Sequence, residues 1–202
     1  MRAPLYDRVA LIGLGLIASS MAHAMRQFGL AAEITGHAKS AETRAIAAEI
    51  GLCDRVFDTA AEAVAGADLV VLCVPVGAMG AIAAEIAPHL EAGAILTDVG
   101  SVKQAVIAAV APHLPAGVEF VAGHPIAGTE HSGPDAGFAE LFVNRWCVLT
   151  PGAEVDPVAI ARLTAFWGAM GSNDECMDAA HHDMVLAITS LGGSNAGKDI
   201  TQ

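Results

Sequence analysis

The residue of this sequence best suited to acid–base chemistry is a histidine in a run of glycine and proline. His124 belongs to the segment GHPIAGTE at residues 123–130, directly after an apolar stretch. An imidazole at such a strand end can face a cleft and exchange a proton near neutral pH, although a loop histidine is often only a surface residue. Thr129 and Glu130 of the same segment are either polar site groups or solvated loop residues.

Two other segments follow apolar stretches in the same way. Ser101 lies where a helix is expected to begin, and capping that helix is the most common role of a serine there. Lys103 is either a counter-charge for an anionic ligand or an ordinary first-turn lysine. Val74 and Pro75 follow another apolar stretch, where their backbone could border a nicotinamide ribose or simply form a turn.

The segment GLGLIA at residues 13–18 matches the pattern G-x-G-x-x-G/A of dinucleotide-binding turns. Gly13 would permit a tight turn, Gly15 would let the backbone approach a pyrophosphate, and Ala18 would allow close packing of helix on strand. Leu16 and Ile17 begin the helix, whose free N–H groups favour an anion. Because the motif follows the first apolar stretch of an alternating β/α chain, we predict a dinucleotide site here.

The choice between NAD and NADP stays open at this level. An acidic residue about 20 residues beyond the turn would bind the ribose 2′-hydroxyl of NAD. No carboxylate stands at that point, whereas His37, Lys39, Ser40 and Arg44 could surround the 2′-phosphate of NADP. Lys39 and Arg44 could equally be solvated surface charges.

Charge and apolar content exclude several classes of protein. The chain of 202 residues has 10 Lys and Arg against 22 Asp and Glu, a net charge of −12, and is 54% hydrophobic. The apolar content argues against intrinsic disorder, and the negative charge argues against nucleic acid and anionic membranes as partners. The longest uncharged runs, residues 9–25 and 69–84, are shorter than the roughly 18 residues of a membrane-spanning helix.

The cysteines indicate neither a metal site nor a disulfide framework. Cys53, Cys73, Cys147 and Cys176 are widely separated and form no C-x-x-C pair. We therefore predict no metal and a reducing, cytoplasmic location.

Short β-branched or Leu-rich stretches alternate with Ala-rich stretches along most of the chain. This alternation predicts an α/β fold, a Rossmann-like doubly wound and mostly parallel sheet. We expect strands near Arg8–Ile12, Glu33–Gly36, Asp68–Val74, Ala94–Asp98, Val118–Ala122 and Arg145–Thr150. We expect helices near Leu16–Phe28, Ala41–Ile50, Ala78–His89 and Val102–Ala111.

The pattern becomes helical after Pro151. One helix is expected over Val155–Met170 and a second from Asp178 to about Ser190, where the Gly-, Ser- and Asn-rich residues 191–197 would end it. We therefore expect a dinucleotide-binding domain at residues 1–176 and the beginning of an all-helical domain at 177–202. Apolar residues near 184–188 are expected to be exposed and to favour association.

These motifs together resemble the prephenate/arogenate (cyclohexadienyl) dehydrogenase family of tyrosine biosynthesis. They occur in the family's order between residue 9 and about residue 190, and the GHPIAGTE segment is the most specific of them. The matching segments are GLGLIASS at 13–20, DVGSVK at 98–103, GHPIAGTEHSG at 123–133, NRW at 144–146, and HHD at 181–183 through AITS at 187–190.

The resemblance implies an NAD(P)-dependent oxidative decarboxylation of prephenate or arogenate, giving 4-hydroxyphenylpyruvate or tyrosine. Hydride leaves the ring carbon that bears the hydroxyl, carbon dioxide departs, and the ring becomes aromatic. His124 matches the family's catalytic histidine, which accepts the hydroxyl proton and must therefore be neutral. Ser101 matches a serine that orients this histidine and contacts cofactor or substrate.

The resemblance also implies a set of substrate-side residues. Thr129 and Glu130 match polar residues that border the substrate, and Ser190 matches a serine at the edge of the pocket. His182 and Asp183 match a polar pair near the entrance to the site, although a water-exposed pair on a helix is an alternative.

Beyond Ser190 the sequence departs from the family pattern. The family continues with a His-Leu-Pro-His-like helix and a helical dimerisation region that supplies an arginine for the substrate carboxylate. The expectation is a truncated family member whose full-length relatives are homodimers. A catalytically impaired dinucleotide-binding module and a β-hydroxyacid dehydrogenase-like enzyme remain alternatives.

Overall fold

An eight-stranded sheet runs through the computed structural model, which describes residues 3–193. The strand order is β3-β2-β1-β4-β5-β6-β7-β8, and every neighbouring pair is parallel except the antiparallel pair β6 and β7. This is the Rossmann-like, mostly parallel sheet that the sequence predicted. The strands are β1 (Tyr6–Ile12), β2 (Ala31–His37), β3 (Arg55–Phe57), β4 (Leu69–Leu72), β5 (Ile95–Asp98), β6 (Glu119–Pro125), β7 (Trp146–Pro151) and β8 (Asn173–Cys176).

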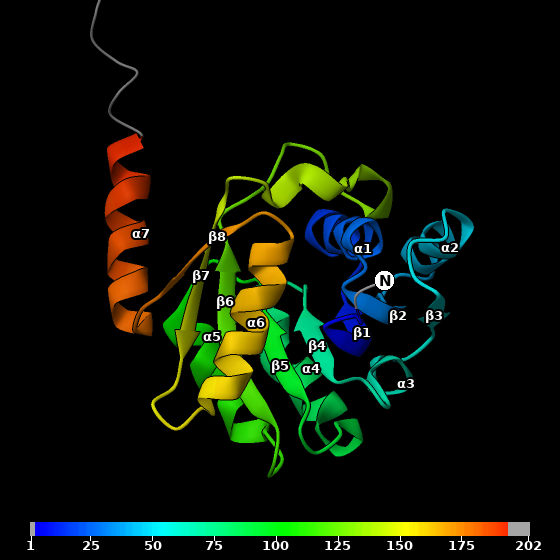
Figure 1. The fold of residues 1–202 in the computed structure, drawn as a ribbon, viewed down its shortest axis with the longest axis horizontal. Helices are drawn as coiled ribbons and strands as arrows, with labels where there is room; N and C mark the ends of the chain where they lie inside the picture. Colours follow the sequence, from blue (N-terminus) through cyan, green and yellow to red (C-terminus); the bar gives the residue numbers. More distant parts are fainter. Residues whose placement is uncertain (1–2, 194–202) are drawn as a thin grey trace, which may run out of the picture.

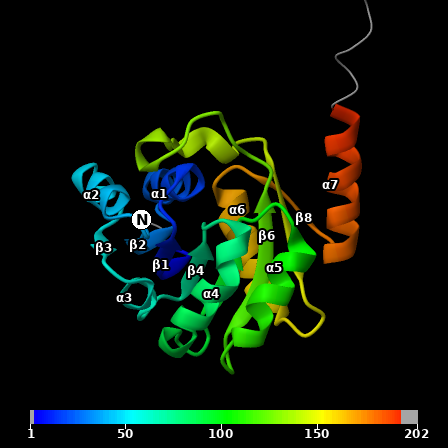
Figure 2. The same cartoon turned by 180° about the vertical axis from the view of Figure 1, so that it is seen from behind.

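Helices cover both faces of the sheet (Figures 1 and 2). One face packs on α1 (Leu16–Phe28), α2 (Ala41–Glu49) and α6 (Pro157–Ala169), and the other on α3 (Ala60–Val64), α4 (Val76–Ile86) and α5 (Lys103–Val110). Successive residues of β1 serve the two cores in turn, since Leu11 belongs to the first and Ile12 to the second. Alternation of this kind explains why β4 and residues 9–12 of β1 are apolar throughout.

Local sequence signals set most helix ends. Gly29 ends α1 in the left-handed conformation, where it lacks the steric penalty of a side chain. The Ser40 hydroxyl caps α2 by accepting the N–H of Thr43, and the Asp156 carboxylate caps α6 by accepting the N–H of Val158. The helix α5 lacks such a cap, because Val102 occupies the capping position.

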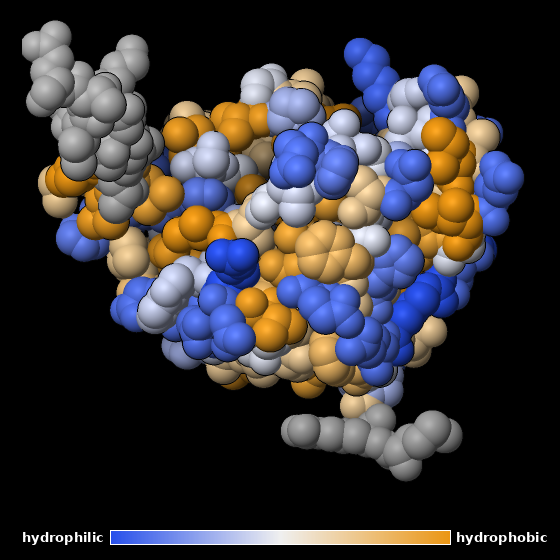
Figure 3. All heavy atoms as spheres, turned by 90° about the horizontal axis from the view of Figure 1, so that it is seen from above, coloured by the Kyte–Doolittle hydropathy of each residue, from blue (hydrophilic) through white to orange (hydrophobic). Residues whose placement is uncertain are grey.

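The last described helix, α7 (Ala179–Gly193), stands outside the two helix layers beside β7 and α5 (Figures 1 and 2). Its apolar residues Met184 and Ile188 are 54% and 65% exposed, as the sequence predicted for this stretch. Viewed from above, this corner of the molecule carries apolar surface (Figure 3). Within residues 3–193, no helix is long and apolar enough to cross a membrane.

Two strands and one α-helix were not predicted, namely β3, β8 and α3. The strand β3 has only three residues, and β8 has the sequence Asn-Asp-Glu-Cys, which lacks the β-branched and aromatic residues that mark strands. Their pairing with β2 and β7 makes them strands, so tertiary contacts outweigh local preference here.

Several predicted boundaries were wrong in ways that affect the site. The strand β6 continues to Pro125, so His124 lies in a strand paired with Val148 and not in a loop. The strand β4 ends at Leu72, and α4 begins at Val76, two residues earlier than expected. The helix α7 continues to Gly193, past its expected end at Ser190.

Candidate functional site

The glycine turn joins β1 to α1 at the carboxyl edge of the sheet. Gly13 has a φ of 98°, and a Cβ there would lie 2.7 Å from the carbonyl oxygen of Cys73, so the turn requires glycine. A Cβ on Gly15 would meet nothing within 4 Å, which leaves open space beside the start of α1. No side chain caps this end of α1, and the fully buried Ala18 packs into the core below.

This turn has the properties of an anion site. The first N–H groups of a helix have no partner within the helix, and the helix dipole favours negative charge beside them. The N–H groups of Leu16 and Ile17 belong to this first turn. Val74 and Pro75 follow the neighbouring strand β4, and His37 ends the neighbouring strand β2. The predicted cofactor residues therefore lie along one edge of the sheet.

The residues predicted to surround a 2′-phosphate are partly engaged elsewhere. The His37 ring is hydrogen-bonded through Nδ1 to the carbonyl of Phe57 at 3.1 Å, and the Ser40 hydroxyl caps α2. The Arg44 guanidinium pairs with Asp58 at 3.1 Å and donates to the carbonyl of Ala38. Lys39 is exposed.

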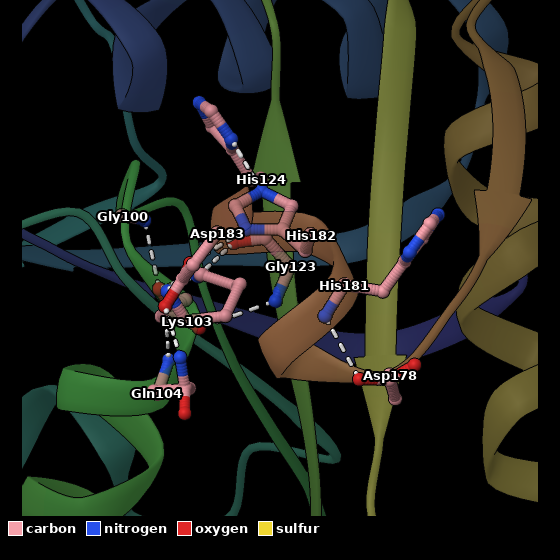
Figure 4. Close-up of polar contacts among 10 residues, drawn as sticks. Gly100, Lys103, Gln104, Gly123, His124, Asp178, His181, His182 and Asp183 are labelled. Atoms are coloured by element: carbon pink, nitrogen blue, oxygen red, sulfur yellow. Dashed lines mark hydrogen bonds and ion pairs between the residues drawn. The ribbon is translucent and has the colours of Figure 1, made fainter. Parts of the chain in front are cut away.

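His124 is joined to a second histidine and a carboxylate from α7 (Figure 4). Its Nδ1 lies 2.9 Å from Nε2 of His182, and Nδ1 of His182 lies 2.8 Å from Oδ1 of Asp183. The side chain of His182 is fully buried, whereas that of Asp183 is 21% exposed. Two residues 58 positions apart in the sequence thus form one polar cluster.

Asp183 of α7 caps the N-terminus of α5, which has no cap from its own segment of the chain. Its Oδ1 accepts the N–H of Lys103 at 2.7 Å, and its Oδ2 accepts the N–H of Gln104 at 3.0 Å. This contact corrects the expectation that Ser101 caps α5, since the structure places Val102 at the capping position and gives it no side-chain cap. A carboxylate at a helix N-terminus is also favoured by the helix dipole.

A buried ion pair lies beneath His124. Lys103 Nζ is 2.5 Å from Asp98 Oδ2 and donates to the carbonyl of Gly123, also at 2.5 Å. Asp98 in turn accepts the N–H groups of Gly100 and Gly123. Lys103 is therefore a structural counter-charge inside the protein, neither a solvated first-turn lysine nor a free cation for a ligand.

Burial and nearby charge set the protonation of the cluster. Burial, together with the neighbouring His182 and the Lys103 cation, lowers the pKa of His124 to about 4, although Asp183 opposes the shift. Burial would raise the pKa of Asp183, but the N–H groups of Lys103 and Gln104 and the ring of His182 lower it to about 2. At neutral pH the cluster therefore contains a neutral His124 and an ionised Asp183.

The segment after β6 crosses over α1. A Cβ on Gly137 would collide with Ser19 Oγ and lie 2.6 Å from the backbone nitrogen of Ser20. The N–H of Phe138 donates to Ser20 Oγ at 3.2 Å. The strand that carries His124 is thereby connected to the helix that carries the glycine turn.

The remaining predicted substrate residues are placed differently. Ser101 is exposed and lines a pocket of about 310 Å³ together with Asp183 and Leu186. Within residues 3–193, the hydrogen-bond partner recorded for the His124 ring is His182, not Ser101. Thr129 and Glu130 are exposed, and Thr129 Oγ1 accepts the N–H of His131 in its own loop. The side chain of Ser190 lies outside the described residues.

Sequence reasoning missed the Asp98–Lys103 pair and the cap that Asp183 provides. The signal for the pair was weak, an aspartate ending an apolar strand and a lysine five residues later. The water-exposed alternative for His182 is wrong, since its ring is fully buried. Within residues 3–193, no group of three or more His, Cys, Asp and Glu side chains is arranged to hold a metal ion.

Comparisons with known proteins agree on one family. The family model described as the nucleotide-binding domain of prephenate dehydrogenase matches residues 21–174. A cyclohexadienyl dehydrogenase from Zymomonas mobilis is 45% identical over 185 residues, which cover 92% of this chain and 63% of that protein. The chain thus spans less than two thirds of the length of this relative.

Solved structures give the same result. An arogenate dehydrogenase from Synechocystis has a TM-score of 0.83 at 30% identity, covering 95% of this chain and 70% of that one. A prephenate dehydrogenase from A. aeolicus in complex with hydroxyphenyl propionate and NAD⁺ has a TM-score of 0.81 at 27% identity, covering 93% of this chain and 68% of that one.

Proposed function

The chain belongs to the prephenate dehydrogenase family, and on that premise we propose that it carries the cofactor site and the proton acceptor of an NAD(P)-dependent oxidative decarboxylation of prephenate, arogenate or both. Residues 1–176 form the dinucleotide-binding domain of this proposal, and residues from 177 onward belong to a helical domain. The observation that carries it is a buried histidine, held neutral, at the carboxyl edge of a sheet that also bears the glycine turn.

The residues of the turn fit a dinucleotide. The open space at Gly15 and the uncapped start of α1 leave room and N–H donors for a pyrophosphate, and the backbone at Leu16 and Ile17 would hold it. Val74 and Pro75 would border the nicotinamide ribose, and His37, Lys39 and Ser40 would lie near the adenosine ribose. When bound, the nicotinamide supplies the acceptor for a hydride from the substrate.

His124 acts on the substrate hydroxyl. As the C–H hydride leaves the ring carbon of the substrate, the O–H proton passes to the neutral imidazole and the carbon–oxygen bond becomes a carbonyl. The bond to the ring carboxylate then breaks and carbon dioxide leaves. The electron pair of that bond moves through the ring to the carbonyl oxygen, which becomes the phenolate of the aromatic product and takes up a proton. The low pKa of His124 keeps the ring available as a base at neutral pH.

The other predicted contacts complete the proposal. Ser101, Thr129 and Glu130 are exposed, and Ser101 lines a pocket together with Asp183. We propose that these side chains border the substrate, with Ser190 at the edge of the pocket. A small organic anion is the substrate class, and no nucleic acid or membrane takes part.

The test combines binding with turnover. NAD⁺ and NADP⁺ are titrated separately into the purified chain by calorimetry, and formation of reduced nicotinamide is then followed with prephenate and with arogenate. We expect one dinucleotide to bind and His124→Asn to lower turnover by about a factor of 10² to 10⁴ while leaving dinucleotide affinity unchanged. His113→Asn, which alters an exposed histidine of another segment, is the control and should behave as wild type.

The outcomes separate the remaining alternatives. Dinucleotide binding without turnover would indicate a binding module. Turnover of a 3-hydroxy acid, with none of prephenate or arogenate, would indicate a β-hydroxyacid dehydrogenase-like enzyme. Turnover unaffected by His124→Asn would remove His124 from the reaction.

Location and assembly are also part of the proposal. All four cysteines are unpaired, which supports a reducing compartment such as the cytoplasm. The exposed Met184 and Ile188 on α7 support association of full-length relatives as homodimers through their helical regions. Cell fractionation tests the first statement, and light scattering of a full-length relative tests the second.

A further inference from the structure

Two hydrogen bonds connect Asp183 to His124 through the ring of His182. The chemistry of the atoms decides which group donates in each of them. The carboxylate of Asp183 already accepts the N–H groups of Lys103 and Gln104, and it stays ionised at neutral pH. An ionised carboxylate has no proton to donate. The contact of 2.8 Å with His182 therefore requires the proton on Nδ1 of His182.

The same reasoning continues to the next ring. Two ring nitrogens in hydrogen-bond contact share one proton, so the state of the buried His182 ring decides that of His124. When Nδ1 of a neutral His182 carries the proton, its Nε2 has a lone pair and can only accept. The contact of 2.9 Å then requires the proton on Nδ1 of His124.

The geometry points to His182 and Asp183 as positioning residues that hold His124 in the Nδ1–H tautomer, so that Nε2 carries the lone pair that accepts the substrate proton. This inference rests on the proposed function for its catalytic meaning, and on the contacts above for the state of the ring. It replaces the expectation that His182 touches substrate, because its ring has no exposed surface.

Other charged groups around His124 are consistent with this arrangement. From α5, the Lys103 cation lies below the ring, and Asp98 of β5 neutralises it across 2.5 Å. Asp183 of α7 acts on the pKa of His124 in the direction opposite to Lys103. A proton arriving on His124 would therefore be stabilised through the hydrogen bonds toward Asp183 and not by a direct ion pair.

The state of the ring can be read without turnover. The chain is prepared with ¹⁵N-labelled histidine, and long-range ¹H–¹⁵N spectra at neutral pH distinguish protonated from unprotonated ring nitrogens. The signals of His124 and His182 are assigned from the variants that lack each ring. We expect both histidines in the Nδ1–H tautomer, although free neutral histidine prefers the Nε2–H form.

Two variants break the chain of contacts at different points. Asp183→Ala removes the acceptor for His182, and His182→Phe removes the acceptor for His124 while keeping an aromatic ring in place. In both we expect His124 to shift to the Nε2–H tautomer. If α7 does not dock in Asp183→Ala, His182→Phe still provides the test, because it retains the carboxylate that caps α5.

Matched controls come from the same helix. His181→Asn changes the neighbouring histidine, which is exposed and points away from the cluster (Figure 4). Asp178→Asn changes another α7 carboxylate, which accepts the N–H of His181 at 2.8 Å and has no recorded contact with the His182 ring within residues 3–193. Both controls should retain the Nδ1–H tautomer of His124.

The outcomes distinguish this inference from the proposed function. An Nε2–H tautomer of His124 in the wild type, an imidazolium at His182, or an unchanged Nδ1–H tautomer in both variants would overturn it. If the expected tautomers are found but turnover is absent, the proposed function is rejected, whereas the Nδ1–H tautomer of His124 is still supported. Where turnover is measurable, Asp183→Ala and His182→Phe should lower kcat by about tenfold or more.

Discussion

Lys103 and Asp98 form an ion pair of 2.5 Å in which neither side chain has any exposed surface. Burial raises the pKa of Asp98 and lowers that of Lys103, and each charge opposes the shift of the other. Through the carbonyl and N–H of Gly123 the pair also holds β6 to β5 one residue before His124. The pair therefore has a structural function in the part of the sheet that carries the proposed proton acceptor.

Removing the cation alone should destabilise the protein strongly. In Lys103→Met the Asp98 carboxylate keeps two N–H donors but loses its buried counter-charge, so we expect the free energy of unfolding in urea to fall by about 3–5 kcal/mol. The double variant Asp98→Asn/Lys103→Met should recover part of this loss. Lys39→Met, at an exposed lysine, should change stability by less than about 0.5 kcal/mol. Equal stability of the two lysine variants would contradict this role.

The two glycines of the turn should respond differently to alanine. Gly13→Ala places a Cβ against the Cys73 carbonyl at a φ of 98°, so we expect a loss of about 1–3 kcal/mol or more. Gly15→Ala meets no protein atom and has an ordinary φ of −99°, so it should cost less than about 1 kcal/mol.

Dinucleotide titration of the same variants tests the site itself. The added methyl group of Gly15→Ala occupies the space proposed for the pyrophosphate, so affinity should fall by about tenfold or more in a protein that remains folded. Unchanged affinity in this variant would show that the pyrophosphate does not approach Gly15.

Acid should destabilise the protein through His124. The pKa of this residue is about 4 in the folded protein and 6.5 when unperturbed, so between these values the unfolded state binds the extra proton. Stability is therefore complete above pH 6.5 and falls as the pH drops toward 4, by on the order of 3 kcal/mol for a shift of this size. In His124→Asn the decline over this window should be shallower.

The measurement is urea unfolding at a series of pH values between 4 and 7. Asp183 contributes in a lower window, since its stabilisation is lost only as the pH falls from 3.8 toward 2. Parallel curves for wild type and His124→Asn above pH 4 would contradict the lowered pKa.

The segment that crosses α1 can be tested with another glycine pair. Gly137→Ala drives a methyl group into Ser19 and the backbone of Ser20, so α1 and the segment must separate. We expect a loss of about 1–3 kcal/mol in thermal or urea unfolding, together with weaker dinucleotide binding. Gly128→Ala, in the same connection between β6 and β7, meets no atom within 4 Å and should leave both unchanged. Similar behaviour of the two variants would show that the contact with α1 is unimportant.

The sequence predicted those features that depend on neighbouring residues. The glycine turn, the apolar stretches of β1 and β4 and the start of α2 at Ala41 are all encoded within a few positions. The cap of α5 could not be predicted in this way, because its carboxylate lies 80 positions from Lys103 in the sequence. The strand β8 was missed for a related reason, since its polar residues pair only once β7 is in place.

The edges of the sheet have a consequence for solubility. Its two outermost strands, β3 and β8, are three and four residues long, and β8 carries the carboxylates of Asp174 and Glu175. Short, charged edges are poor templates for the backbone pairing that begins aggregation. The open edges of the sheet in this 54% hydrophobic chain thus offer another copy few backbone partners, and at β8 they also present like charge.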